Sequence, residues 1–138
     1  MYTYFVAIYK LGVLLDTDQT LAYAYAKAGM DSAFSKQAFY EALVDAITYY
    51  TGNQTLKPEF FALGAEVLQV QIDEYPYPEL LSMHKYYSKL ADWHSRANNK
   101  AEAVKAIEKA IAALKNKPTA TSADQSKLEA DLQRYRSM

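Results

Sequence analysis

The stretch that decides the fold runs from residue 84 to residue 115 and reads HKYYSKLADWHSRANNKAEAVKAIEKAIAALK. Apolar residues recur at spacings of three and four on both sides of Asn98-Asn99, which is the period of one face of an α-helix. Two helices joined by so short a connection pack side by side in opposite directions. The stretch therefore predicts an antiparallel hairpin of helices over Glu79–Ala97 and Lys100–Lys115.

The same helical period continues through the rest of the 138 residues, and no segment shows the strict alternation of a strand. Stop and start signals divide it into further helices. Asp16-Thr17-Asp18 ends one helix and caps the next, Ser35 caps a third, Pro58 begins a fourth, and Ser122 with Gln125 forms a capping box for the last. The predicted helices outside the hairpin cover Thr3–Leu15, a stretch from an Asp or Thr cap in the Asp16-Thr17-Asp18 cluster to about Phe34, and then Lys36–Tyr50, Pro58–Glu74 and 122–136.

The sequence thus predicts an all-α protein of about seven helices in one domain over residues 1–138. The helical pattern begins almost at Met1, as it would in a domain excised from a larger protein. In the hairpin's first helix, two neighbouring faces are apolar, which favours stacked antiparallel hairpins over a simple bundle. The two faces consist of His84, Tyr87, Ala91 and His94, and of Met83, Tyr86, Leu90, Trp93 and Ala97. The last helix has only the narrow stripe Leu128, Leu132 and Tyr135, which is typical of a capping helix.

The stretch 84–115 resembles a tetratricopeptide repeat. Aromatic, Leu, small and ring-bearing side chains occur in its first helix, and small, bulky and small ones in its second. These residues are Tyr87, Leu90, Ala91 and His94, followed by Ala103, Ile107 and Ala110. His94 replaces the usual Tyr, Ala91 the usual Gly, and the proline comes late, as Pro118. The resemblance implies a right-handed superhelix that binds proteins or peptides.

A narrower resemblance covers Phe60–Gln69, Tyr75-Pro76-Tyr77-Pro78, Leu90–Trp93 and Glu108–Ile111. These segments are similar to the helical C-terminal region that follows a thioredoxin-like domain in some secreted bacterial proteins. The resemblance implies that the chain accompanies a redox domain and is periplasmic or secreted. The chain has no cysteine, so any redox activity would belong to the linked domain.

Composition excludes several classes of function. Fifteen Lys and Arg balance sixteen Asp and Glu, so no general attraction to nucleic acid is expected. No run approaches the roughly 20 apolar residues of a bilayer span, and no membrane insertion is expected. Apart from what the second resemblance implies, the sequence leaves the localisation unknown.

No residue set indicates catalysis, a cofactor or a metal. His84 and His94 are the only histidines, and about 15 Å of helix separates them, too far for one metal ion. Asp16-Thr17-Asp18 resembles the start of a calcium loop, but Leu21 stands where glycine is required and Lys27 where glutamate is. The chain is therefore predicted not to be an enzyme.

Two functions remain open. The first is a non-catalytic scaffold that packs against a partner protein, a peptide or a linked domain, with a predicted interaction surface of Tyr75, Tyr77, Lys85, Ser88, Lys89, Asp92, Ser95 and Arg96. The second is a module that binds a sugar or an apolar metabolite in a pocket lined by some of its thirteen tyrosines. Adjacent pairs such as Tyr49-Tyr50 argue for the first, because neighbouring side chains on a helix are expected to diverge.

Overall fold

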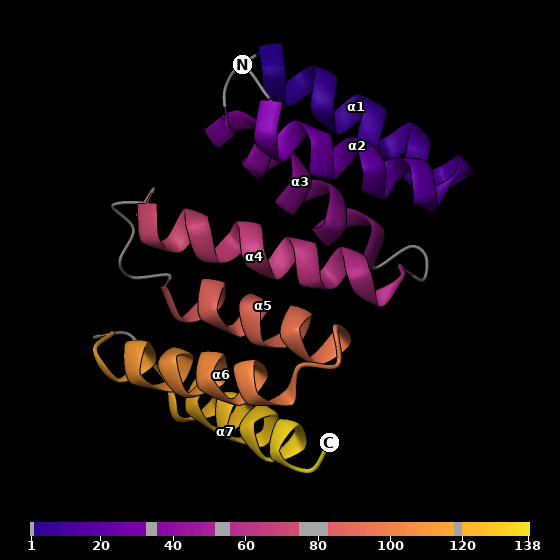
Figure 1. The fold of residues 1–138 in the computed structure, drawn as a ribbon. Coiled ribbons are helices and arrows are strands. Elements are labelled where there is room, and N and C mark those ends of the chain that lie inside the picture. The colour runs from indigo at the N-terminus through magenta and orange to yellow at the C-terminus, as the bar shows by residue number, and fades with distance from the viewer. Residues whose placement is uncertain (1, 33–35, 52–55, 75–82, 118–119) are drawn as a thin grey trace. The chain divides into compact units, whose positions relative to one another are not determined.

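The computed structural model describes residues 2–32, 36–51, 56–74, 83–117 and 120–138. These residues form seven helices and no strand, and about 90% of them are helical (Figure 1). The all-α fold predicted from the helical period is confirmed. The helices are α1 (Tyr2–Thr17), α2 (Gln19–Ser32), α3 (Lys36–Thr51), α4 (Pro58–Glu74), α5 (Met83–Arg96), α6 (Lys100–Lys115) and α7 (Ser122–Arg136). None of these helices is both long and apolar enough to span a bilayer.

Local caps explain the boundary between α1 and α2. The Asp18 carboxylate accepts hydrogen bonds from the backbone N–H groups of Thr20 and Leu21, at 3.0 and 3.2 Å, and so caps α2. Because Asp18 alone caps α2, Asp16 and Thr17 are not needed as caps and belong to α1. The helix α1 therefore ends at Thr17, two residues beyond the predicted end at Leu15. Three predicted boundaries lie outside the described residues: the end of the second helix at Phe34, the cap of the third helix at Ser35, and the start of the fifth helix at Glu79.

The capping box of α7 is one residue earlier than predicted. Thr121, not Ser122, is the N-cap: its hydroxyl accepts a bond from the Asp124 N–H at 3.1 Å, and the Asp124 carboxylate accepts one from the Thr121 N–H at 3.2 Å. The prediction of Ser122 with Gln125 was wrong because a short Asp side chain at the third helical position closes the same reciprocal pair as Glu or Gln.

Asn98 and Asn99 end α5 and begin α6. Asn98 has a φ of 63°, in the left-handed region that asparagine tolerates, and the Asn99 N–H donates to the His94 carbonyl at 2.8 Å. The Asn99 side chain then accepts a bond from the Glu102 N–H and caps α6. The sharp turn predicted from these two residues is confirmed.

The described chain divides into two compact units, the first formed by α1 to α4. In it, α1 packs against α2 and α3, and α3 packs against α2 and α4. Contacts pair Tyr4 with Asp45 near the start of α1, and Gly12 with Tyr50 further along, so α1 and α3 run in the same direction. The apolar core of this unit includes Leu11, Ala22, Ala26, Phe39, Leu43, Ile47, Phe60 and Val67.

In the second unit α5 and α6 form the predicted hairpin, and α7 packs against α6. Ala103 and Ala110 are fully buried, as expected for small residues that allow two helices to approach closely. Leu128 and Tyr135 of α7 are buried and Leu132 is half-buried, which confirms the narrow apolar stripe. A salt bridge of 3.3 Å between Arg136 and Glu108 links α7 to α6. A single domain over 1–138 and a superhelix through both units stay predictions.

Candidate binding groove

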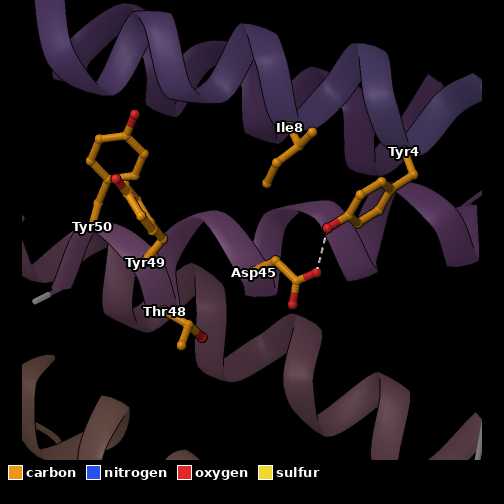
Figure 2. Close-up of a pocket in the computed structure, with 6 residues that line it drawn as sticks. All are labelled: Tyr4, Ile8, Asp45, Thr48, Tyr49 and Tyr50. Atoms are coloured by element: carbon orange, nitrogen blue, oxygen red, sulfur yellow. Dashed lines mark hydrogen bonds between the residues drawn. The ribbon is translucent and has the colours of Figure 1, made fainter.

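A groove with a volume of about 550 Å³ lies between α1 and α3 in the first unit (Figure 2). It opens to solvent and its lining is mostly apolar. The lining residues are Tyr4, Ile8, Asp45, Thr48, Tyr49 and Tyr50. None of them belongs to the interaction surface predicted from the sequence.

Two pairs of side chains at helical spacing form the walls. Tyr4 and Ile8 lie four residues apart on α1, and Asp45 and Tyr49 lie four residues apart on α3. Residues at this spacing are neighbours on one helix face, about 5 to 6 Å apart at their Cβ atoms. Because α1 and α3 run in the same direction, the two pairs face each other across the groove (Figure 2).

One wall is linked to the other by a short hydrogen bond. The Tyr4 hydroxyl donates to Oδ2 of Asp45 at 2.6 Å (Figure 2). This bond, together with burial and the negative charges of Asp45 and Glu41, raises the pKa of Tyr4 to about 12. At neutral pH the phenol therefore keeps its proton and holds the carboxylate in one orientation.

Tyr50 closes the end of the groove. Its hydroxyl lies 3.0 Å from the Gly12 carbonyl oxygen and 3.3 Å from an oxygen of Asp16, so its single proton has two acceptors on α1. Burial raises the pKa of Tyr50, and the nearby charge of Asp16 raises it further. A side chain at Gly12 would place its Cβ 3.1 Å from this hydroxyl, so the Tyr50 ring would have to shift by a few tenths of an ångström to accommodate it.

Tyr49 supplies the exposed aromatic surface of the groove. Its side chain is 65% exposed, and its ring packs edge-to-face on that of Tyr50, with centroids 5.0 Å apart. The expectation that this adjacent pair diverges was wrong, because the two rings are in contact and both line the groove. The Tyr50 side chain points toward α1, to which its hydroxyl donates a hydrogen bond, and the Tyr49 ring packs against the Tyr50 ring.

The groove has negative charge and no basic side chain in its lining. Within the described residues, the only hydrogen bond to the Asp45 side chain comes from Tyr4. Glu41 and Asp16 add negative charge nearby, as their effects on Tyr4 and Tyr50 show. The Thr48 hydroxyl donates to the Val44 carbonyl oxygen of its own helix at 2.8 Å. Aromatic faces beside a carboxylate are suited to binding a group with an apolar stem and a positive end.

The predicted interaction surface lies on α5, in the second unit, where it is described. Lys85 and Arg96 are exposed, whereas Ser88, Lys89, Asp92 and Ser95 are half-buried. Arg96 pairs with Asp92 at 3.0 Å, and the Ser95 hydroxyl donates to the Asp92 carbonyl oxygen at 2.8 Å. Tyr75 and Tyr77 lie outside the described residues. Asp92, Ser95 and Arg96 therefore contact one another within α5, and the Lys89 ammonium lies 5.9 Å from the centroid of the Trp93 ring.

The histidines of α5 are both half-buried. Burial lowers the pKa of His94, and the negative charge of Glu102 on α6 partly opposes this effect. Among the described residues, no three His, Asp or Glu side chains come together in a way that would hold a metal ion.

No protein-family model matches the chain, and no curated protein or solved structure shows significant similarity to it. Both resemblances noted in the sequence therefore stay predictions.

Proposed function

We propose that the chain is a non-catalytic helical interaction module that binds a partner protein, a peptide or a covalently linked domain. The observation that carries the proposal is the open groove between α1 and α3. Its walls belong to two helices, and the hydrogen bonds of Tyr4 and Tyr50 hold these helices in register. The binding surface is therefore formed already in the unbound chain. A preformed surface loses little conformational freedom on binding.

The resemblance to thioredoxin-associated helical regions names one candidate for a linked partner. On this proposal the redox chemistry resides in that domain, and the helical chain contributes contact surface. The mixed-charge surface on α5, with Lys85 and Arg96 exposed, is a second place at which such a domain would dock. The compartment would then be periplasmic or extracellular.

The interaction proposal is tested by selecting short random peptides on the full chain from a phage-displayed library. Thr48→Trp places a large side chain in the lining of the groove, and Thr20→Trp places the same side chain on an exposed position of α2 as the control. We expect the wild type and Thr20→Trp to bind the enriched peptides and Thr48→Trp to lose them. Peptides that bind all three proteins equally would show that the groove is not the interaction surface.

A second candidate function is the binding of a sugar or an apolar metabolite. Tyr4, Tyr49 and Tyr50 come from two helices and converge on one groove, which is large enough for a small ligand. Ligand-observed NMR with maltose and with cyclohexanol as probes separates this candidate from the first. Saturable binding of either probe that Thr48→Trp abolishes would favour a metabolite site, and no binding of either would oppose one.

A further inference from the structure

We propose that the groove between α1 and α3 binds the guanidinium group of an arginine side chain on a partner protein. The inference rests on the proposed function, because it specifies the chemistry of the partner for the same groove. It depends on three features of the lining: an exposed ring, an oriented carboxylate and an apolar wall.

The exposed ring is that of Tyr49. Tyr49 is 65% exposed in the unbound chain although its ring contacts that of Tyr50, so aromatic surface is accessible to a flat cation. Guanidinium groups are planar and weakly hydrated, so they stack on aromatic faces more readily than ammonium groups do. This feature favours arginine over lysine.

The oriented carboxylate is that of Asp45, one turn of α3 before Tyr49. Tyr4 binds its Oδ2 at 2.6 Å, and within the described residues no other hydrogen bond reaches this side chain. The second oxygen, Oδ1, is therefore available as an acceptor for a guanidinium N–H. Since neighbours four residues apart are about 5 to 6 Å apart at Cβ, one guanidinium can stack on the ring while it donates to the carboxylate.

The apolar wall is formed by Ile8 and by the ring of Tyr4. The three methylene groups of an arginine would pack there as the charged end reaches Asp45. An anionic partner is disfavoured, because Asp45 lines the groove and Glu41 and Asp16 lie close enough to raise the pKa values of Tyr4 and Tyr50. Charge complementarity thus selects a cation.

The test is an NMR titration of the ¹⁵N-labelled full chain. The probes are n-butylguanidinium chloride, its neutral analogue n-butylurea, and the peptide acetyl-Ala-Arg-Ala-amide with its citrulline counterpart, all at matched ionic strength. We expect saturable shifts at groove amides of α1 and α3 with both guanidinium probes and not with either neutral analogue. Raising the salt concentration should weaken the binding.

Variants identify the two main contacts. Asp45→Asn removes the charge but keeps an oxygen that accepts the Tyr4 proton, and because the site is exposed we expect about two- to fivefold weaker binding. Tyr49→Ala should weaken binding by a similar factor, about two- to fivefold, whereas Tyr49→Phe, which keeps the ring, should not. Asp31→Asn is the matched charge control, since Asp31 is exposed on α2 and does not line the groove. Circular dichroism is used to check that each variant is folded.

Equal shifts with butylurea and butylguanidinium would overturn the arginine proposal, because binding would then not depend on the charge of the ligand. Unchanged binding by folded Asp45→Asn would overturn it as well, and so would binding of butylguanidinium without binding of the arginine peptide. The peptide selection with Thr48→Trp is independent of these outcomes, so a failure of the proposed function is seen separately.

Discussion

Replacing Gly29 with alanine tests how closely α2 and α3 approach each other. A Cβ at this position would lie 2.1 Å from Cζ of Phe39 and 2.4 Å from Cε2, far inside the 3.4 Å at which ordinary contact begins. The ring would have to move by more than 1 Å to restore such a contact. Phe39 is 2% exposed and its ring also packs against that of Tyr25, at 5.9 Å between centroids, so it has little room to move.

Two opposing effects decide the size of the change. Alanine is about 1 kcal/mol more favourable than glycine within a helix. Overpacking a filled core costs about 1 to 3 kcal/mol, and the overlap at Gly29 places this site at the upper end of that range. We therefore expect Gly29→Ala to lower the free energy of unfolding by about 2 kcal/mol, against the direction that helix propensity alone would give.

Urea unfolding of the full chain, followed by circular dichroism, measures this change. Ala24→Gly, at an exposed position of the same helix, measures the propensity difference without a packing contact. Phe39→Leu removes the ring that the added Cβ would overlap. Gly29→Ala should therefore lower the free energy of unfolding by less in the Phe39→Leu background, and the double-mutant cycle gives the coupling energy between the two positions. If Gly29→Ala were as stable as the wild type or more stable, the close approach of α2 and α3 would be refuted.

Four further predictions concern single features. Burial lowers the pKa of His94 below its ordinary value of 6.5, so the unfolded chain takes up a proton before the folded chain does, and stability should fall as the pH drops below 6.5; His94→Gln should flatten this dependence in thermal melts, and an equally steep curve would contradict it. Because Asn98 has a positive φ, Asn98→Gly should be neutral or stabilising and Asn98→Ala should cost about 1 kcal/mol, measured by urea unfolding; the reverse order would contradict the turn. The pKa of Tyr4 is raised to about 12, so its contribution to stability is present below pH 10.0 and is lost as the pH rises toward 12. The tyrosinate absorbance of the wild type minus that of Tyr4→Phe should show this late titration, and a midpoint near 10.0 would contradict the bond to Asp45. Removal of residues 118–138 should uncover part of α6 and cause concentration-dependent association in sedimentation experiments, and a monomer with unchanged melting temperature would show that α7 is not part of the core.

The sequence predicted much of the fold because its signals are local. The apolar period and the caps depend on residues a few positions apart, and they placed α4 and α6 at the observed bounds. Where the prediction failed, a competing local bond decided the outcome: Thr121 and Asp124 closed the capping box in place of Ser122 and Gln125.

The groove could not be predicted in the same way. Its walls meet only because α1 and α3 lie side by side, and Tyr4 and Asp45 are 41 residues apart in the chain. The one local signal was the i, i+4 spacing of Tyr4 with Ile8 and of Asp45 with Tyr49. This spacing indicates that each pair shares a helix face, but it does not indicate which other helix that face contacts. The predicted surface on α5 relied on a resemblance, and its assignment as an interaction site stays a prediction.

The three-residue connection between α5 and α6 also has a consequence for how the chain acquires its structure. Neighbours in this hairpin are close in sequence, so closing the loop between them restricts few residues, and contacts of this kind form early and fast. Synthesis from the N-terminus delivers both helices before α7 leaves the ribosome. During that interval the part of α6 that the fifteen-residue helix α7 later covers is open to water, and exposed apolar surface of this kind promotes aggregation until α7 packs against it.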